Sequence, residues 1–205
     1  MGNKEKLCNE LFDIGAVKFG VFTLKSGLKS PIYIDLRILV SYPETLKKVA
    51  KEISKKCKKL EFERIAGIPY AAIAIATAVS MQNKWPMIYT RKEAKDYGTK
   101  KLIEGIYKDG ERVVVIDDLI TTGASKIETI APLQEAGLKV KDIVVLVDRE
   151  QGGRKELAEK GYGLHSALTI TKMLKILLKN GKINENQYRD IDAYFKNPEK
   201  WQEGK

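Results

Sequence analysis

Two adjacent acids end an aliphatic run in "RVVVIDDLITTGASKIET", residues 112–129. Asp117 and Asp118 are followed by a small polar loop that contains Gly123. The glycine permits a tight turn, and the small residues around it let backbone N–H groups face a common centre, which together with a helix N-terminus forms a phosphate nest. Two carboxylates would repel a phosphate unless they bind something else, and ribose hydroxyls or a magnesium ion would satisfy them. The combination predicts a sugar-phosphate site.

A purely structural alternative exists for the same residues. Asp117 would only end a strand, and Thr121 or Thr122 would only start the cap of the next helix. Two acids followed by T-T-G-A-S favour the ligand site over this alternative. Other nucleotide motifs fail, because no G-x-x-x-x-G-K-[ST] occurs and the nearest approach to G-x-G-x-x-G lacks its third glycine.

Short aliphatic segments alternate with helical segments around this motif. The segments "RIAGI", "PMIYT", "RVVVID" and "DIVVLVD" begin at residues 64, 86, 112 and 142. They are apolar on consecutive residues, as strands buried on both faces are. Helical patterns lie at 71–83, 124–136 and 153–160. The alternation predicts an α/β fold with a central, mostly parallel sheet flanked by helices, in which ligands bind beyond the carboxyl ends of the strands.

The two ends of the chain add smaller elements to this core. Residues 3–13 read as an amphipathic helix, and residues 17–37 as a hairpin-like flap with a turn at Ser26-Gly27 and a break at Ser30-Pro31. A helical pattern starts at Pro43. We predict one domain over residues 1–205, made of an N-terminal helix and hood (1–40), an α/β core (41–170) and C-terminal helices (171–205).

Composition narrows the class of protein. The 205 residues carry a net charge of +10, two cysteines and one histidine, which argues against a disulfide framework or a Cys/His zinc site. Both cysteines are expected to pack as small apolar groups, and His165 to have a structural or surface role. No apolar run reaches the ~20 residues of a membrane span, and the N-terminus lacks the apolar segment of a signal peptide, so a cytoplasmic protein is expected. The basic charge fits a lysine-rich solvated surface, or a need to hold polyanions.

The segment "VVVIDDLITTGAS" resembles the phosphoribosyl pyrophosphate (PRPP) motif of type I phosphoribosyltransferases. The resemblance implies that fold, and it implies that Asp117 and Asp118 hold the ribose hydroxyls while Thr121 to Ser125 wrap the 5-phosphate. The motif does not specify the base that accepts the sugar.

Three further segments resemble orotate phosphoribosyltransferases. "RKEAKD", at residues 91–96, is similar to their mobile catalytic loop, "FTLKSGLKSPIYID" to their N-terminal hood, and "DREQGG" to the turn whose arginine faces the orotate carboxylate. A guanidinium suits that task because it forms two parallel hydrogen bonds to a carboxylate. The resemblance assigns catalysis to Lys95, Asp117 and Asp118, and orotate binding to Tyr33, Ile34, Thr121 and Arg149. The residues it assigns to PRPP are Lys25, Tyr70, Ala71, Arg91, Lys92, Lys95, Tyr97, Asp117, Asp118, Leu119, Ile120, Thr121, Thr122, Gly123, Ala124 and Ser125.

Two positions depart from the bacterial pattern of that family. Tyr97 stands where many bacterial members carry histidine, and Ala71 where they carry lysine, so one cation is missing. In both respects the chain is more similar to the orotate phosphoribosyltransferase half of bifunctional UMP synthases. A decarboxylase barrel would need about 200 further residues, so only the first activity is expected of this chain.

The resemblance implies an activity and an assembly. The expected enzyme forms orotidine 5′-monophosphate and pyrophosphate from PRPP and orotate, in pyrimidine biosynthesis, with Mg²⁺ held mainly through PRPP rather than by certain protein ligands. The expected assembly is a homodimer in which Arg91, Lys95 and Tyr97 reach the partner's site while Lys92 serves its own chain. Neither a nucleic-acid nor a membrane partner is expected.

Two other functions stay open at this point. The chain could transfer the phosphoribosyl group to a purine or to uracil. It could also be a nucleic-acid-binding regulator that keeps the fold and uses the +10 charge, although such a protein has little reason to retain "RKEAKD".

Overall fold

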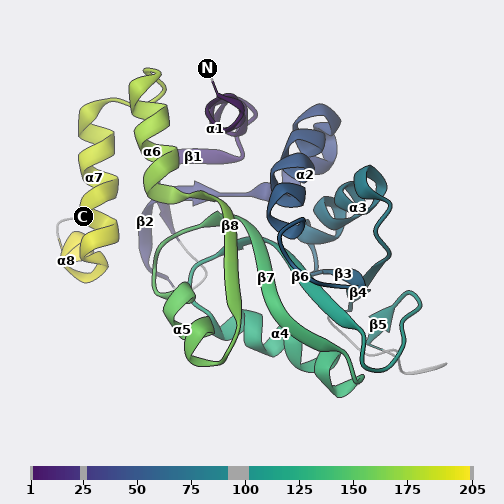
Figure 1. The fold of residues 1–205 in the computed structure, drawn as a ribbon. Coiled ribbons are helices and arrows are strands. Elements are labelled where there is room, and N and C mark those ends of the chain that lie inside the picture. Colours follow the sequence, from purple (N-terminus) through teal and green to yellow (C-terminus); the bar gives the residue numbers. More distant parts are fainter. Residues whose placement is uncertain (1, 24–26, 92–101, 204–205) are drawn as a thin grey trace. The chain divides into compact units, whose positions relative to one another are not determined.

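The computed structural model describes residues 2–23, 27–91 and 102–203. The chain divides into two compact units, residues 1–38 with 171–205, and residues 39–170 (Figure 1). Each unit is described by itself.

A six-stranded sheet forms the centre of the unit at residues 39–170, in the order β5-β4-β3-β6-β7-β8. Only β5 is antiparallel to its neighbour, β4, and the other pairings are parallel. The mostly parallel sheet is therefore confirmed. Its strands are β3 (Arg64–Gly67), β4 (Met87–Thr90), β5 (Ile103–Glu104), β6 (Arg112–Ile120), β7 (Lys139–Asp148) and β8 (Gly163–Thr169).

Helices cover both faces of this sheet (Figure 1). The pair α2 (Pro43–Cys57) and α3 (Ala71–Asn83) packs against one face, and α4 (Ala124–Glu135) and α5 (Gly153–Glu159) pack against the other. Burial on both faces explains the apolar run of β6, where the side chains of residues 113–116 are at most 2% exposed. Asp117 and Asp118 therefore follow directly on the buried part of a central strand.

The other unit joins the two ends of the chain. It contains α1 (Asn3–Asp13), the antiparallel strands β1 (Val17–Thr23) and β2 (Lys29–Ile34), and the helices α6 (Ile170–Lys179), α7 (Glu185–Lys196) and α8 (Pro198–Glu203); a 3-10 helix, η1 (Leu36–Ser41), leads out of it. The predicted hairpin is confirmed, but the predicted break at Ser30-Pro31 is wrong because both residues lie inside β2. The β1–β2 ladder is irregular between Phe19 and Phe22, and Pro31 falls opposite that irregularity, where a missing N–H is tolerated.

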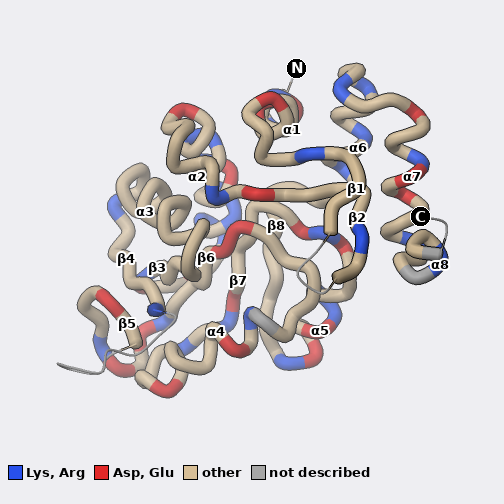
Figure 2. Tube along the Cα trace, turned by 180° about the vertical axis from the view of Figure 1, so that it is seen from behind, with Lys and Arg blue, Asp and Glu red and all other residues tan. Residues whose placement is uncertain are grey.

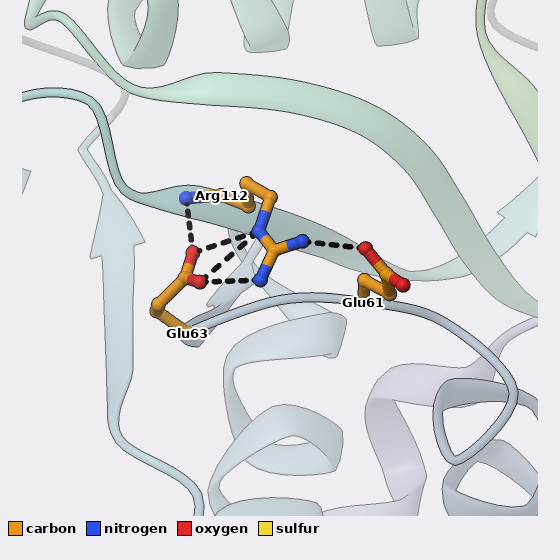
Figure 3. A network of polar contacts seen from close by, with 3 residues as sticks. All are labelled: Glu61, Glu63 and Arg112. Carbon is orange, nitrogen blue, oxygen red and sulfur yellow. Dashed lines mark hydrogen bonds and ion pairs between the residues drawn. The ribbon is translucent and has the colours of Figure 1, made fainter.

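Ion pairs fix the amino-terminal ends of β3 and β6. Arg112 binds Glu61 through Nη1 and Glu63 through Nη2, both at 2.6 Å (Figure 3). Arg64 binds Glu111 through two nitrogens, at 2.6 and 2.9 Å. These contacts join β3 and the segment before it to the start of β6. They support the register of the two strands at the end opposite the carboxyl edge.

Basic and acidic residues are interspersed over the elements of both units (Figure 2). This distribution matches a solvated, lysine-rich surface.

Cys8 and Cys57 are free and buried, as expected, and burial raises the pKa of their thiols to about 11 and about 12. His165 lies on β8, where its Nε2 is 2.7 Å from Asp142 Oδ1 on β7. None of the helices in the described ranges is long and apolar enough to cross a membrane.

The Arg64–Glu111 pair predicts a pH dependence of stability. The guanidinium of Arg64, aided by the Lys108 N–H, lowers the pKa of Glu111 to about 2 from an ordinary value of 4.5. A lowered carboxyl pKa stabilises the folded state above about pH 4.5, and the stabilisation is lost as the pH falls toward 2. We expect Glu111→Gln to lower the free energy of unfolding at pH 7, with the deficit shrinking as the pH falls from 4.5 to 2, in urea titrations.

Glu61→Gln is the matched control, because the Glu61 side chain is 87% exposed and its ion pair is solvated. It should change the free energy of unfolding less than Glu111→Gln at pH 7. A Glu111→Gln deficit that stays constant down to pH 2 would contradict the assignment.

Candidate functional site

The carboxyl edge of the sheet gathers predicted site residues from four adjacent strands. Arg91 follows β4, Tyr70 lies in the turn after β3, and Arg149 follows β7. Asp117 and Asp118 lie near the carboxyl end of β6. Backbone hydrogen bonds continue past the strand ends, from Ile68 N–H to Ile116 O at 3.2 Å, and from Arg149 N–H to Ile120 O at 2.9 Å. The parallel topology therefore brings these segments together, as the sequence predicted.

Asp117 is a buried acid whose two oxygens both accept hydrogen bonds from the protein. Its side chain is 5% exposed. Oδ1 accepts the Asp118 N–H at 2.8 Å, and Oδ2 is paired with the Lys126 ammonium. Burial raises the pKa of Asp117, the Lys126 ammonium opposes this rise, and the Asp118 carboxylate adds to it. The ionised form of Asp117 thus depends on its lysine partner.

Asp118 differs from Asp117 although it is the adjacent residue. It is half-buried, and its Oδ1 accepts the N–H of Leu119 at 2.7 Å. Consecutive strand residues point to opposite faces of a sheet, so the two carboxylates have different surroundings. Asp118 is the more accessible acid, and Asp117 is the one enclosed by donors.

The small polar loop after β6 is tied to the segment after β7. Thr121 O accepts the Gly153 N–H at 3.1 Å, and Gly123 N–H donates to Glu156 Oε2 at 2.7 Å. The predicted convergence of loop amides therefore does not include the Gly123 N–H, because a carboxylate on α5 already accepts it. Helix α5 therefore contacts the loop through Glu156 and through the Gly153 N–H.

Helix α4 begins at Ala124, and Gly123, rather than Thr121 or Thr122, is its N-cap residue. The alternative that Thr121 or Thr122 serves only as a helix cap is therefore wrong. Thr122 and Ala124 are exposed and Thr121 is half-buried, so this stretch of the loop lies at the surface. Uncapped N–H groups at a helix start are a ready site for an anion.

The turn that carries Arg149 is held by Asp148 and Arg154. Asp148 Oδ1 accepts the Glu150 N–H at 2.8 Å, and Asp148 Oδ2 lies 3.1 Å from Arg154 Nη2. Arg154 Nη1 also donates to Leu164 O on β8 at 2.6 Å. The turn is thereby anchored to the edge strand, which fixes the backbone that presents Arg149.

Tyr70 and Ala71 begin α3 next to this edge. The Tyr70 side chain is 68% exposed, as a residue that contacts a ligand should be, whereas Ala71 is buried. Arg91 is anchored in its own chain, since its N–H donates to Leu102 O at 2.8 Å and its Nη1 to Glu104 Oε1 at 2.8 Å. The residues on either side of the undescribed stretch 92–101 are therefore hydrogen-bonded to each other.

The remaining predicted residues fall into three groups. Leu119 is half-buried, whereas the Ile120 side chain is fully buried beneath Gly153, so Ile120 offers only its backbone to the surface. Tyr33 and Ile34 lie on β2 in the other unit, and their orotate contacts stay predictions. Lys25, Lys92, Lys95 and Tyr97, and the side chain of Ser125, lie outside the described part of the chain.

Three residues at this edge were missed by the sequence reasoning: Lys126, Glu156 and Arg154. Lys126 carried a usable signal, because a lysine in the first turn of a helix opposes the helix dipole and needs a compensating acid. Glu156 and Arg154 carried none, since nothing local shows which backbone groups they will meet.

The described part of the chain contains no group of three or more His, Cys, Asp and Glu side chains that could hold a metal ion. Both Asp117 oxygens accept hydrogen bonds from protein donors, and Asp118 is the more exposed of the two acids.

The phosphoribosyl transferase domain model matches residues 39–161. The chain is 48% identical over 191 residues to uridine 5′-monophosphate synthase of Bos taurus, covering 92% of this chain and 40% of that protein. It is 39% identical over 174 residues to orotate phosphoribosyltransferase of Pyrococcus abyssi, covering 84% and 96%.

The structure of Leishmania donovani UMP synthase is similar to this one, with a TM-score of 0.88 and 46% identity over 95% of this chain and 42% of that chain. The chain thus spans about two-fifths of the length of these UMP synthases and nearly the whole of the archaeal enzyme. The match covers the paired acids, the loop after them and the turn that carries Arg149. The chain belongs to the phosphoribosyltransferase family.

Proposed function

We propose that this protein is an orotate phosphoribosyltransferase, which transfers the 5-phosphoribosyl group from PRPP to orotate and releases pyrophosphate. The observation that carries the proposal is the hydrogen-bonded connection between the loop after Asp118 and the turn of Arg149. It supports the proposal because the segment proposed to bind the sugar phosphate and the arginine proposed to bind the carboxylate of the base follow neighbouring strands. The orotate phosphoribosyltransferase and UMP synthases that the chain resembles support this base.

The residues at this edge have distinct roles in the proposed reaction. The start of α4 and the loop from Thr121 to Ser125 bind the 5-phosphate, while Asp117 and Asp118 accept hydrogen bonds from the ribose hydroxyls. Breaking the bond to pyrophosphate develops positive charge on the sugar, as in glycoside hydrolysis. Two carboxylates beside the ribose stabilise that charge, and cations directed at the leaving pyrophosphate stabilise its negative charge.

Mg²⁺ is proposed to enter with PRPP. When bound, it neutralises part of the pyrophosphate charge. The pyrophosphate of PRPP would supply oxygens to the ion, which are the ligands that Mg²⁺ prefers. The protein's part is to hold the ribose and the phosphate at the edge of the sheet.

The proposed assembly is a homodimer that shares the "RKEAKD" segment between subunits. A neighbouring subunit would give a loop that closes over PRPP a second wall. Arg91, Lys95 and Tyr97 are proposed to reach the partner's site, and Lys92 to serve its own chain. Arg91 Nη1 lies 2.8 Å from Glu104 Oε1 of its own chain.

An absorbance assay of orotate consumption with PRPP and Mg²⁺ tests the function directly. Adenine, hypoxanthine, guanine and uracil in place of orotate form the comparison set. Turnover with orotate alone supports the proposal, whereas turnover with another base would assign the chain to a different phosphoribosyltransferase. Salt-dependent binding of RNA or DNA without any turnover would favour the regulator.

Asp118→Asn should weaken PRPP binding without unfolding the protein. Asp118 is half-buried, and its Oδ1 bonds to the Leu119 N–H, which an amide oxygen can also accept. Losing one charge-assisted contact costs about 1.5–3 kcal/mol, or roughly a 10- to 100-fold higher Kd for PRPP. Calorimetric titration and a thermal melt measure the two effects. A large fall in Tm with unchanged PRPP affinity would show that Asp118 is structural.

Arg149→Ala should raise the KM for orotate much more than the KM for PRPP. The expected loss is about 1.5–3 kcal/mol, because a charged pair to the orotate carboxylate disappears. Steady-state kinetics with each substrate varied in turn measure the split. Arg189→Ala, at an exposed position on α7, should change neither constant. Equal increases for both substrates would remove Arg149 from the orotate pocket.

Mixed dimers test the shared loop. Lys95→Ala and Asp118→Asn subunits should each be nearly inactive, because removing a group directed at developing charge costs about 10²–10³ in turnover. When the two are refolded together, one site of each heterodimer receives Lys95 and Asp118 intact, so activity should return. No recovery in heterodimers verified by mass would mean that the loop serves its own chain.

A further inference from the structure

Lys126 occupies an unusual position for a cation. It lies in the first turn of α4 (Ala124–Glu135), where the helix dipole disfavours positive charge, and its side chain is only 13% exposed. A buried ammonium is costly unless it is paired and hydrogen-bonded. The Lys126 partner is Asp117 Oδ2, so burial of this lysine is explained by one acid at the end of β6.

Asp117 depends on Lys126 in the same way. Its side chain is 5% exposed and adjacent to a second carboxylate, Asp118, and both conditions favour a protonated acid. An ionised carboxylate accepts hydrogen bonds about twice as strong as those between neutral groups. A cation at Oδ2 therefore decides whether Asp117 is a strong acceptor.

The contacts of Asp117 also fix its orientation. The Asp118 N–H holds Oδ1 and the Lys126 ammonium holds Oδ2, so both ends of the carboxylate are fixed before any ligand binds. Each carboxylate oxygen retains a further lone pair for a hydroxyl. Asp118, by comparison, accepts a bond from the next backbone N–H.

We propose that Lys126 is a positioning residue for the sugar, which holds Asp117 ionised and correctly oriented to accept hydrogen bonds from ribose hydroxyls. Lys126 acts through Asp117 and does not itself contact the phosphate. The inference rests on the proposed function for the identity of the sugar phosphate. It adds a role that neither the paired acids nor the loop after them supplies.

Two probes separate action on the sugar from action on the phosphate. Ribose 5-phosphate and inorganic phosphate share the anion and differ in the ribose, and neither needs orotate or turnover. Calorimetric titrations of the parent and of Lys126→Met, Lys126→Arg and Lys182→Met with each probe form the test. Lys182 is the matched control, because it pairs with Asp13 at 2.6 Å and belongs to the other unit.

Lys126→Met should weaken ribose 5-phosphate by about tenfold or more, the difference between a charge-assisted and a neutral contact, and leave inorganic phosphate within about twofold. Lys126→Arg, which keeps the charge, should recover most of the ribose 5-phosphate affinity. Lys182→Met should match the parent with both probes. Equal weakening of both probes would show that Lys126 contacts the phosphate, and no weakening of either would show a purely structural ion pair. Both outcomes overturn the proposal.

A double variant guards against misfolding of Lys126→Met. Asp117→Asn with Lys126→Met removes both buried charges together, and it should fold and show the same loss that is specific to the ribose. A folded double variant that binds ribose 5-phosphate as tightly as the parent would refute the role of the pair. Because the parent's orotate turnover is assayed separately, a parent that binds ribose 5-phosphate but does not consume orotate disproves the proposed function and leaves the Lys126 test intact.

Discussion

The backbone hydrogen bonds that continue beyond the ends of β6 and β7 are the constraint on which the site depends. Ile120 pairs with Asp148 as the last step of the ladder, after which Ile120 O accepts the Arg149 N–H and Thr121 O accepts the Gly153 N–H. These bonds force the loop after Asp118 and the turn of Arg149 to share one framework. The loop after Asp118 and the backbone of Arg149 are therefore held at a fixed separation by the protein alone.

Charge is used differently at the two edges of the same sheet. At the amino edge, Arg112 is 43% exposed and its partner Glu61 87% exposed, so solvent screens that ion pair and it adds little to stability. At the carboxyl edge, Asp117 and Lys126 are 5% and 13% exposed, and removing one partner of such a pair costs about 3–5 kcal/mol. The Arg112–Glu61 pair is therefore solvated, whereas the Asp117–Lys126 pair is buried.

Much of the fold follows from local pattern, and its exceptions have physical causes. Consecutive apolar residues predict strands β3, β4, β6 and β7, and turn residues predict the hairpin of β1 and β2. The two-residue strand β5 has no detectable period, and β8 is an edge strand whose sequence includes His165 and Ser166. Edge strands have one solvated side, so their composition is mixed and gives a weaker signal.

The candidate site also has a part that local sequence predicts and a part that depends on how the helices pack. The paired acids and the loop after them are contiguous in sequence, so their chemistry is readable without coordinates. The pairing of Asp117 with Lys126, nine residues later, and of Gly123 with Glu156, 33 residues later, depends on where α4 and α5 dock.

A crystal structure with PRPP and Mg²⁺ tests the account most directly. It should place the 5-phosphate against the start of α4 and the ribose hydroxyls on Asp117 and Asp118. PRPP bound elsewhere, with this edge of the sheet empty, would contradict it.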